Sequence, residues 1–296
     1  MQGRHISLIV VVAFSTAWAA DPGPKQAPQR EEIEIDVVSM LMESTVRLQG
    51  AGGSATAFIL TLHEAPGIPP ATVLITAAHA LESMGDDCKL TIRAAAQDGS
   101  WAPYTLRVEV RPHGDKHWVR HPTADIAAMF VNLEPNLVPK NGFLTTSYLV
   151  EDELMTKLDI RTGDEAFTLS FPRGVLANED GYPILRGGRI GSYPLYPTRF
   201  AQGFVMDTEL YEGEYGAPVV VLRNLTKEIL GAEAKVPKGR LGVIVGLVAR
   251  MEGATTTVRL QTVLPSSMIR DTLGLLAEAA RRGTLPKSGG FKRERS

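Results

Sequence analysis

Short apolar runs, broken by glycine and proline, dominate the middle of this chain. Segments 44–49 and 55–62 alternate apolar and polar residues, which is the period of a strand with one buried face, and 72–76 is a continuous apolar run. The same signals predict two series of strands, at 44–49, 55–62, 72–76, 89–94, 104–110 and 126–131, and at 165–170, 189–193, 203–208, 218–222, 242–248 and 255–260. About six strands in each half predict an all-β fold of two six-stranded antiparallel barrels, since closure leaves few exposed edges.

One stretch near the end of the chain has a helical period instead. Pro265 and Ser266 provide a start signal, apolar residues then recur on one stripe, and Gly283 provides a stop, which predicts a helix over about 266–282 that packs on the barrel surface. The predicted domain spans 36–280, with a first barrel over about 40–135 and a second over about 150–264. Residues 283–296 are rich in lysine and arginine beside glycine and serine, and we expect a disordered basic tail.

The beginning of the chain has the features of a secretory signal peptide. Arg4 and His5 precede an apolar run, and small residues follow up to Ala19 and Ala20. We therefore interpret 1–20 as a signal peptide with cleavage near Ala19 or Ala20, 21–35 as an extended leader, and the mature chain as secreted or periplasmic. The apolar run is too short to cross a bilayer as a helix, so we expect no integral membrane segment after cleavage.

The composition of the chain limits the kinds of partner and of cysteine chemistry that we expect. The 296 residues are 44% hydrophobic and 22% charged with a net charge of -2, so no overall positive field would attract nucleic acid, and we predict no nucleic-acid partner. Cys88 is the only cysteine, which excludes an internal disulfide. Because no second cysteine or adjacent base accompanies it, we interpret Cys88 as a small buried hydrophobic residue rather than a reactive thiol.

Candidate chemistry lies in a glycine-flanked turn. Segment 212–218 reads Glu-Gly-Glu-Tyr-Gly-Ala-Pro and leads into an apolar strand. Gly213 and Gly216 free the backbone to present Tyr215 at a sharp corner with its amide outward. Upstream, segment 73–81 ends an apolar run in Thr-Ala-Ala-His at 76–79, and segment 121–131 places Asp125 directly before another apolar run. A carboxylate at the mouth of a strand can accept the Nδ1 proton of His79 and hold its tautomer.

These segments, in the order histidine, aspartate and glycine-flanked corner, resemble the chymotrypsin-like (trypsin-fold) serine peptidases of bacterial type. Segments 50–60, 163–174 and 241–247 are similar to further strands of that family, and the resemblance covers about 43–276. It implies that His79 is a general base, that Asp125 orients it, and that the Gly213 and Tyr215 amides form an oxyanion hole. It also implies a pocket with Glu209 at its base and Leu247 on its lining strand, and it implies no cofactor and no metal.

Tyrosine occupies position 215, where that family has its nucleophilic serine. A phenol oxygen lies several ångströms farther from its Cα than a serine Oγ, and the ring fills the space that a scissile peptide needs, so Tyr215 is not suited to attack. We therefore expect an exported peptidase homologue without peptidase activity that binds a peptide or protein. Its oligomeric state does not follow from the sequence.

Other interpretations remain open at this point. The chain could be an active serine endopeptidase that acts through His79, Asp125 and a normally present or substitute serine, for which Ser170 and Ser192 are candidates. His79 and Asp125 could equally be a hydrogen-bonded pair without a chemical role. Tyr215 could plug the cleft, with its hydroxyl bonded to His79 or to a carbonyl. A further set, His113, His117 and His121, has the spacing of a helical metal face, but the prolines and glycine among them favour a loop.

Overall fold

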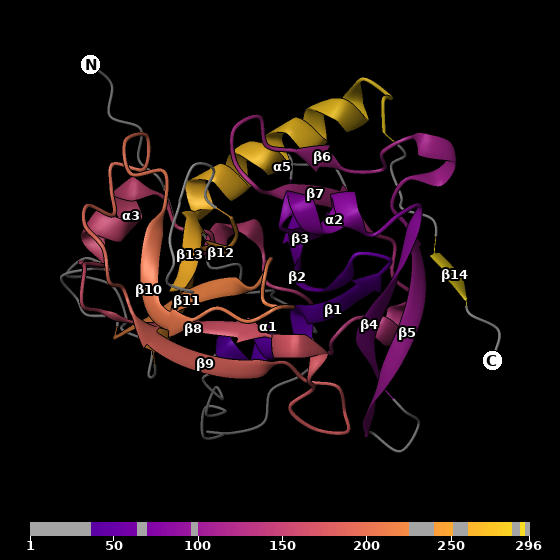
Figure 1. Ribbon diagram of the computed structural model, residues 1–296, viewed down its shortest axis with the longest axis horizontal. Coiled ribbons are helices and arrows are strands. Elements are labelled where there is room, and N and C mark those ends of the chain that lie inside the picture. The colour runs from indigo at the N-terminus through magenta and orange to yellow at the C-terminus, as the bar shows by residue number, and fades with distance from the viewer. Residues whose placement is uncertain are drawn as a thin grey trace, which may run out of the picture. The chain divides into compact units, whose positions relative to one another are not determined.

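Seven strands from the first half of the chain and one from its C-terminal end form one antiparallel sheet. In the computed structural model the sheet has the order β14-β5-β4-β1-β2-β3-β7-β6 (Figure 1). The strands are β1 (Thr45–Gly50), β2 (Gly53–Leu62), β3 (Ala71–Thr76), β4 (Asp87–Ala95), β5 (Trp101–Glu109), β6 (Val119–Arg120), β7 (Ala127–Phe130) and β14 (Phe291–Arg293). β1 pairs with β2 and β2 with β3, so antiparallel neighbours follow one another along this part of the chain.

The second half forms a six-stranded antiparallel sheet that curls into a nearly closed barrel. Its order is β10-β13-β12-β11-β8-β9. The strands are β8 (Glu165–Ser170), β9 (Ile184–Arg189), β10 (Phe204–Glu209), β11 (Pro218–Asn224), β12 (Arg240–Val248) and β13 (Leu260–Pro265). An antiparallel bridge between Ile190 and Met206 joins the two outer strands, so the sheet returns on itself.

Helices surround the two sheets. They are α1 (Val37–Ser44), α2 (Ala78–Ser83), α3 (Asp152–Lys157) and α5 (Ser266–Arg281), with short 3-10 turns η1 (Pro112–Gly114), η2 (Pro135–Leu137), η3 (Thr146–Tyr148) and η4 (Pro172–Gly174). Ile269, Leu273 and Leu276 of α5 are buried on the stripe that the sequence predicts. No helix among the described residues is long and apolar enough to cross a membrane.

The structure describes residues within the compact unit Glu34–Ser296. The described ranges are 37–63, 70–95, 100–224, 240–250, 260–285 and 291–293. The predicted signal peptide and leader therefore lie outside the described residues, as do most of the predicted strand 255–260 and parts of the predicted tail.

The predicted all-β class, with two antiparallel sheet units and a C-terminal helix, is confirmed. The first sheet has eight strands instead of six because the two-residue β6 and the three-residue β14 extend its edges. β14 lies within the predicted tail, where Phe291–Arg293 pairs with β5. The eight-residue helix α1 was not predicted.

One strand of the second sheet lies earlier in the chain than the pattern predicts. The sequence predicts a strand at 189–193, whereas the strand in the structure is β9 at Ile184–Arg189. β9 contains Gly187 and Gly188, and paired glycines in a sequence usually indicate the end of a strand. A Cβ atom at Gly188 would lie 1.9 Å from Thr208 Oγ1, so glycine permits a close approach of neighbouring strands there.

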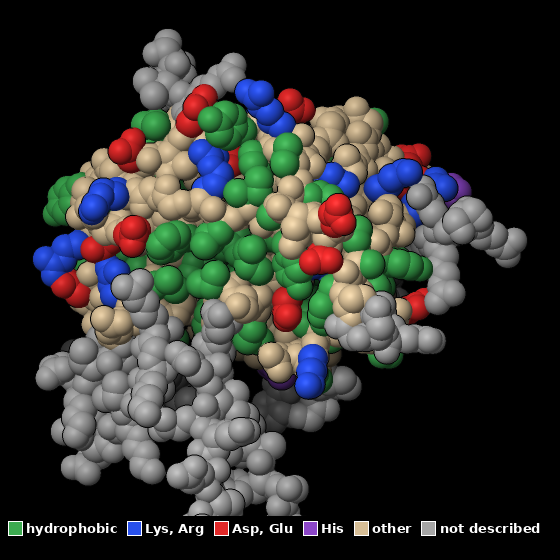
Figure 2. Space-filling view, turned by 90° about the horizontal axis from the view of Figure 1, so that it is seen from below, with side chains coloured by type: hydrophobic (Ala, Val, Ile, Leu, Met, Phe, Trp, Pro, Cys, Tyr) green, Lys and Arg blue, Asp and Glu red, His purple; other side chains and the backbone are tan. Residues whose placement is uncertain are grey.

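Two hydrophobic clusters form the core, and one of them spans both sheets. Leu169, Val220 and Ile244 from the second sheet pack into the cluster that holds the first sheet and α5. Cys88 is buried in the same cluster, as the sequence predicts, and burial raises the pKa of its thiol to about 12. On the face that Figure 2 shows, acidic and basic side chains are interspersed around an area of hydrophobic surface.

A buried arginine ties the two halves together. Arg93 on β4 donates to the carbonyl oxygens of Gly181 at 2.9 Å and Thr45 at 2.6 Å, and to the carbonyl of Glu43. Its guanidinium also lies 5.0 Å from the centre of the Tyr182 ring. Burial is the main reason that the pKa of Arg93 is lowered, to about 10, and three carbonyl partners compensate the buried charge.

Replacing Arg93 with methionine should lower the free energy of unfolding by about 3 kcal/mol or more, because three buried carbonyls lose their donor. Urea unfolding measures this change. Arg107→Met is the matched control on the adjacent strand β5, where the side chain is exposed and pairs with Asp87, and it should cost less than about 1 kcal/mol. Equal losses for the two variants would contradict the inferred role of Arg93.

Candidate functional site

His79 and Asp125 meet where the first sheet ends. His79 lies in the first turn of α2, directly after β3, and Asp125 lies in the turn before β7, the strand that pairs with β3. His79 Nδ1 is 2.5 Å from Asp125 Oδ2, and the His79 amide donates to Asp125 Oδ1 at 2.8 Å. The Arg250 amide donates to Asp125 Oδ2 at 3.0 Å. The carboxylate therefore fixes both the position and the orientation of the imidazole.

The pKa of Asp125 is lowered from its ordinary value. Burial is the largest influence and alone would raise that pKa, because it penalises the charged form. The hydrogen bonds from the His79 ring and amide, the charge of His79 and the Arg250 amide together outweigh burial. The protein is therefore built to hold Asp125 as a carboxylate although only 3% of the residue is exposed.

The segment 211–217 forms a tight corner before β11. Both Gly213 and Gly216 have a φ of 90°, in the left-handed region that side chains disfavour. Space is equally restrictive, since a Cβ atom at Gly213 would lie 2.5 Å from the Phe171 carbonyl oxygen, and one at Gly216 would lie 2.0 Å from that of Thr56. The two glycines are therefore required by conformation and by close packing.

Thr56 on β2 holds this corner from the opposite sheet. Its hydroxyl donates to the Gly213 carbonyl at 2.7 Å and accepts from the Phe171 amide at 3.1 Å, while its own amide donates to the Tyr215 carbonyl at 2.9 Å. The Thr76 hydroxyl donates to the Thr56 carbonyl at 2.6 Å. Thr56 is fully buried, so water does not compete for these bonds.

A buried carboxylate fixes the same corner from within the second sheet. Glu214 is fully buried and forms an ion pair with Arg186 of β9. It also accepts from Ser170 Oγ at 3.0 Å, from Gln261 Nε2 at 3.1 Å and from the Tyr211 amide at 2.8 Å. Because the charge is paired and its oxygens have several donors, burial of Glu214 is compatible with a stable fold.

Tyr215 packs its ring against His79. The two ring centres are 4.6 Å apart and the planes are inclined by 86°, which is an edge-to-face contact. The Arg250 guanidinium lies 5.2 Å from the centre of the Tyr215 ring. The Tyr215 hydroxyl has no hydrogen-bond partner among the described residues, so the suggested bond from that hydroxyl to His79 or a carbonyl is absent there.

Two backbone amides at the corner have no protein acceptor. Within the part of the chain that the structure describes, neither the Gly213 amide nor the Tyr215 amide donates a hydrogen bond. The carbonyls of the same two residues are both bonded to Thr56, which fixes the peptide planes that carry the corner. Amides held in this way can serve as donors to an anion without reorganisation.

The two predicted pocket residues do not line a described pocket. Glu209 is exposed and accepts a hydrogen bond from the Tyr211 hydroxyl at 2.8 Å, so it does not sit at the base of a pocket. Leu247 is fully buried in the core of β12, because it pairs with Pro218 and packs inward. Segment 251–259, which follows β12 and Arg250, lies outside the described residues.

The other candidate residues are engaged elsewhere. Ser170 donates to Glu214, and Ser192 Oγ accepts from the Val205 amide at 2.9 Å, so neither serine contacts His79. His113 lies in the 3-10 turn η1, and the buried His121 Nδ1 accepts from the Thr123 and Ala124 amides.

Sequence reasoning missed the residues that support the corner. Thr56 and Glu214 lie inside the segments that carried the family resemblance. Their roles depend on residues far away in the chain, because Thr56 bonds to Gly213, 157 positions later, and Glu214 pairs with Arg186, 28 positions earlier. Arg250 follows an apolar strand without a motif of its own. Glu214 offered the one available signal, since a charged residue between two glycines before a buried strand must find a partner.

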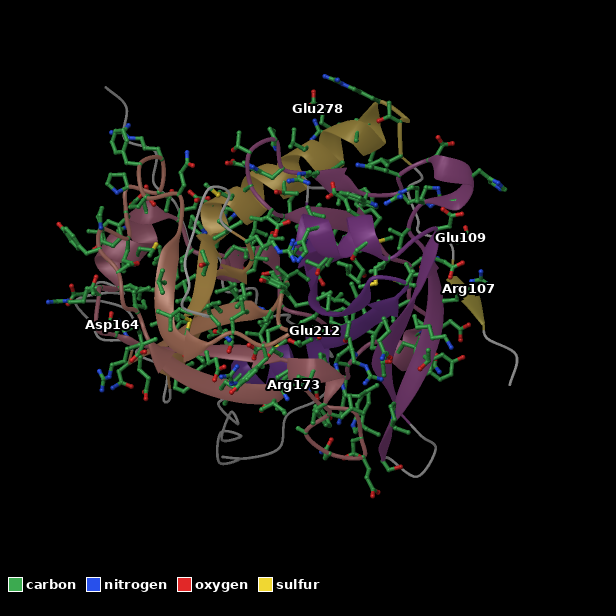
Figure 3. All side chains as sticks on the ribbon, viewed as in Figure 1. Arg107, Glu109, Asp164, Arg173, Glu212 and Glu278 are labelled. Carbon is green, nitrogen blue, oxygen red and sulfur yellow. The ribbon has the colours of Figure 1, made fainter. Side chains whose placement is uncertain are left out.

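Figure 3 shows Glu212 and Arg173 of this region side by side, where the Arg173 amide donates to the Glu212 carbonyl at 2.5 Å.

Replacing Thr56 with valine should lower the free energy of unfolding by about 2–4 kcal/mol, because the Gly213 carbonyl and the Phe171 amide each lose a buried partner. Thr168→Val is the matched control. Thr168 is fully buried too, but its hydroxyl has no hydrogen-bond partner among the described residues, so its replacement should not lower the free energy of unfolding. Urea unfolding compares the two, and a neutral Thr56→Val would contradict the described role.

The lowered pKa of Asp125 predicts a pH dependence of stability. A carboxyl group with a folded-state pKa below its unfolded value stabilises the fold above the unfolded pKa, and this stabilisation is lost as pH falls through the folded pKa. Asp125→Asn should therefore be less stable than the parent at neutral pH, and the difference should shrink as pH falls below about 4 and through the lowered folded-state pKa. Urea unfolding over this range measures it, and a constant difference would contradict the assignment.

Comparison with known proteins gives structural neighbours only. No family model and no curated protein sequence matches the chain. An inactive serine-to-alanine mutant of Rv3671c from M. tuberculosis is similar with a TM-score of 0.44 and 16% identity, over 86% of this chain and 97% of that chain. The Rv3671c protease in its inactive form is similar with a TM-score of 0.42 and 16% identity, over 86% and 98%. The scabies mite inactivated protease paralogue S-I1 is similar with a TM-score of 0.44 and 14% identity, over 84% and 98%.

Proposed function

We propose that this chain is an exported homologue of the trypsin-like serine peptidases that does not hydrolyse peptide bonds and instead binds a peptide or protein segment at the Tyr215 corner. The observation that carries the proposal is the edge-to-face contact between Tyr215 and His79, with ring centres 4.6 Å apart. In this contact the aromatic ring packs directly against the imidazole that Asp125 orients.

Acyl transfer needs a nucleophile within hydrogen-bond reach of the general base, about 2.6–3.2 Å. The contact between Tyr215 and His79 is ring on ring, and the two candidate substitute serines are bonded to Glu214 and to the Val205 amide. His79 therefore has an orienting partner in Asp125 but no described hydroxyl to activate.

Support for binding comes from the rigidity of the corner. Thr56 and Glu214 fix its peptide planes with buried hydrogen bonds, and Tyr215 presents a half-buried aromatic surface. A rigid site loses little conformational entropy on binding, and a tyrosine contributes contact area with few rotatable bonds. The proposed export rests on the signal-peptide features of 1–20, and the mass of the mature protein tests it.

The parent protein should not react with a fluorophosphonate and should not cleave casein, because it lacks a positioned nucleophile. Tyr215→Ser should gain fluorophosphonate labelling, since His79, Asp125 and the two corner amides are already arranged for acyl transfer. Adding His79→Ala should remove this labelling. Gel fluorescence measures all three proteins, and labelling of the parent would contradict the proposal.

Peptide binding is tested by photo-crosslinking. With p-benzoylphenylalanine in place of Tyr215, the protein should crosslink to intact peptides of a random decapeptide pool. The same replacement at Phe200 is the control, because Phe200 is an aromatic residue with 74% exposure elsewhere on the second half. Mass spectrometry reads the products. Equal yields at the two positions, or cleaved peptides, would contradict the proposed function.

A further inference from the structure

Donors and cationic groups gather around Tyr215. The centre of the Tyr215 ring lies 4.6 Å from the centre of the His79 ring and 5.2 Å from the Arg250 guanidinium. The backbone amide of Tyr215 is one of the two corner amides without an acceptor among the described residues. We propose that this site recognises the C-terminal carboxylate of a peptide, with Arg250 and the Gly213 and Tyr215 amides as its donors. This inference rests on the proposed function, since it names the chemical class of the ligand.

The backbone of Arg250 is fixed beside His79, and its side chain has no carboxylate partner among the described residues. Its amide is bonded to Asp125 Oδ2 at 3.0 Å, which fixes the start of the side chain beside His79. Its guanidinium faces the Tyr215 ring and has no carboxylate partner among the described residues. A planar guanidinium stacked on a ring keeps its N–H groups available at the edge, in the geometry that matches a carboxylate.

The corner amides provide complementary donors. Gly213 and Tyr215 are separated by a single residue, and the intervening Glu214 amide donates to the Tyr211 carbonyl at 3.3 Å. Backbone N–H groups at tight turns can bind anions, and these two amides, which have no acceptor among the described residues, are donors of that kind. A carboxylate carries a full negative charge, so it accepts stronger hydrogen bonds from these donors than the oxygen of a neutral amide does.

Each neighbouring acidic side chain makes its own contacts. Asp125 accepts three hydrogen bonds from His79 and Arg250. Glu214 is paired with Arg186 and is fully buried. The Glu212 carboxylate reaches toward the β1–β2 turn, where its Oε1 would lie 3.3 Å from a Cβ atom at Gly53. Among the described residues, the Arg250 guanidinium forms no ion pair with any of the three, so it can pair with the carboxylate of a ligand.

The experiment compares three fluorescent decapeptide pools of degenerate sequence by fluorescence anisotropy. One pool has a free C-terminal carboxylate, one has a C-terminal amide, and one has a C-terminal amide with a glutamate at a fixed internal position. The parent protein should bind the free-acid pool at least about tenfold more tightly than either amidated pool, since charge-assisted hydrogen bonds contribute this much.

Arg250→Gln should bring the ratio of the free-acid and amide affinities close to one. Its backbone bond to Asp125 is retained and its side chain is exposed, so the fold should persist. Arg199→Gln is the matched control, because Arg199 is an exposed arginine stacked 4.7 Å from the centre of the Phe200 ring, and it should leave the ratio unchanged.

The outcomes separate this inference from the function on which it rests. Equal binding of the free-acid and amidated pools would overturn carboxylate recognition while peptide binding stands. Binding of the internal-glutamate pool as tightly as the free-acid pool would overturn recognition of the chain terminus. Binding of none of the pools would overturn both this inference and the proposed function.

Discussion

The hydrogen bonds of one buried threonine connect the two halves of this protein at its candidate site. Thr56 belongs to β2 of the first sheet, yet its hydroxyl and amide are bonded to the Gly213 and Tyr215 carbonyls of the second half. Because these bonds are shielded from water, the corner that carries Tyr215 cannot move away from β2 without leaving polar groups unsatisfied. The position of Tyr215 against His79, which β3 and α2 supply, is a direct consequence of this constraint.

The site therefore combines a bonded histidine and carboxylate with an aromatic ring held at a rigid corner. His79 and Asp125 are bonded to one another, and the corner amides are free of protein acceptors in the described part of the chain. Such a framework is preformed for an anionic or polar ligand, and preformed sites bind without the entropic cost of ordering loops. The buried pair of Glu214 and Arg186 maintains this arrangement without a ligand.

Much of this arrangement follows from the sequence. Alternation and apolar runs predicted most strands, and the order of the motifs around His79, Asp125 and Tyr215 brought three distant residues into one site. Glu209 was placed by the spacing of the family and Leu247 by the resemblance of its strand, and the structure puts the first at the surface and the second in the core. Spacing cannot report which way a side chain points, because orientation depends on the pairing of strands. Contacts between sheets, such as those of Thr56, leave no periodic pattern at all.

The contact between Tyr215 and His79 is most directly tested by nuclear Overhauser spectroscopy on protein with labelled histidine and tyrosine. The ring centres are 4.6 Å apart, so the ring protons of these two residues should give strong cross peaks, and the His79 Nδ1 proton should show the downfield shift of a bond to Asp125. Absence of cross peaks between the two rings, together with a serine hydroxyl proton close to the His79 ring, would contradict this account.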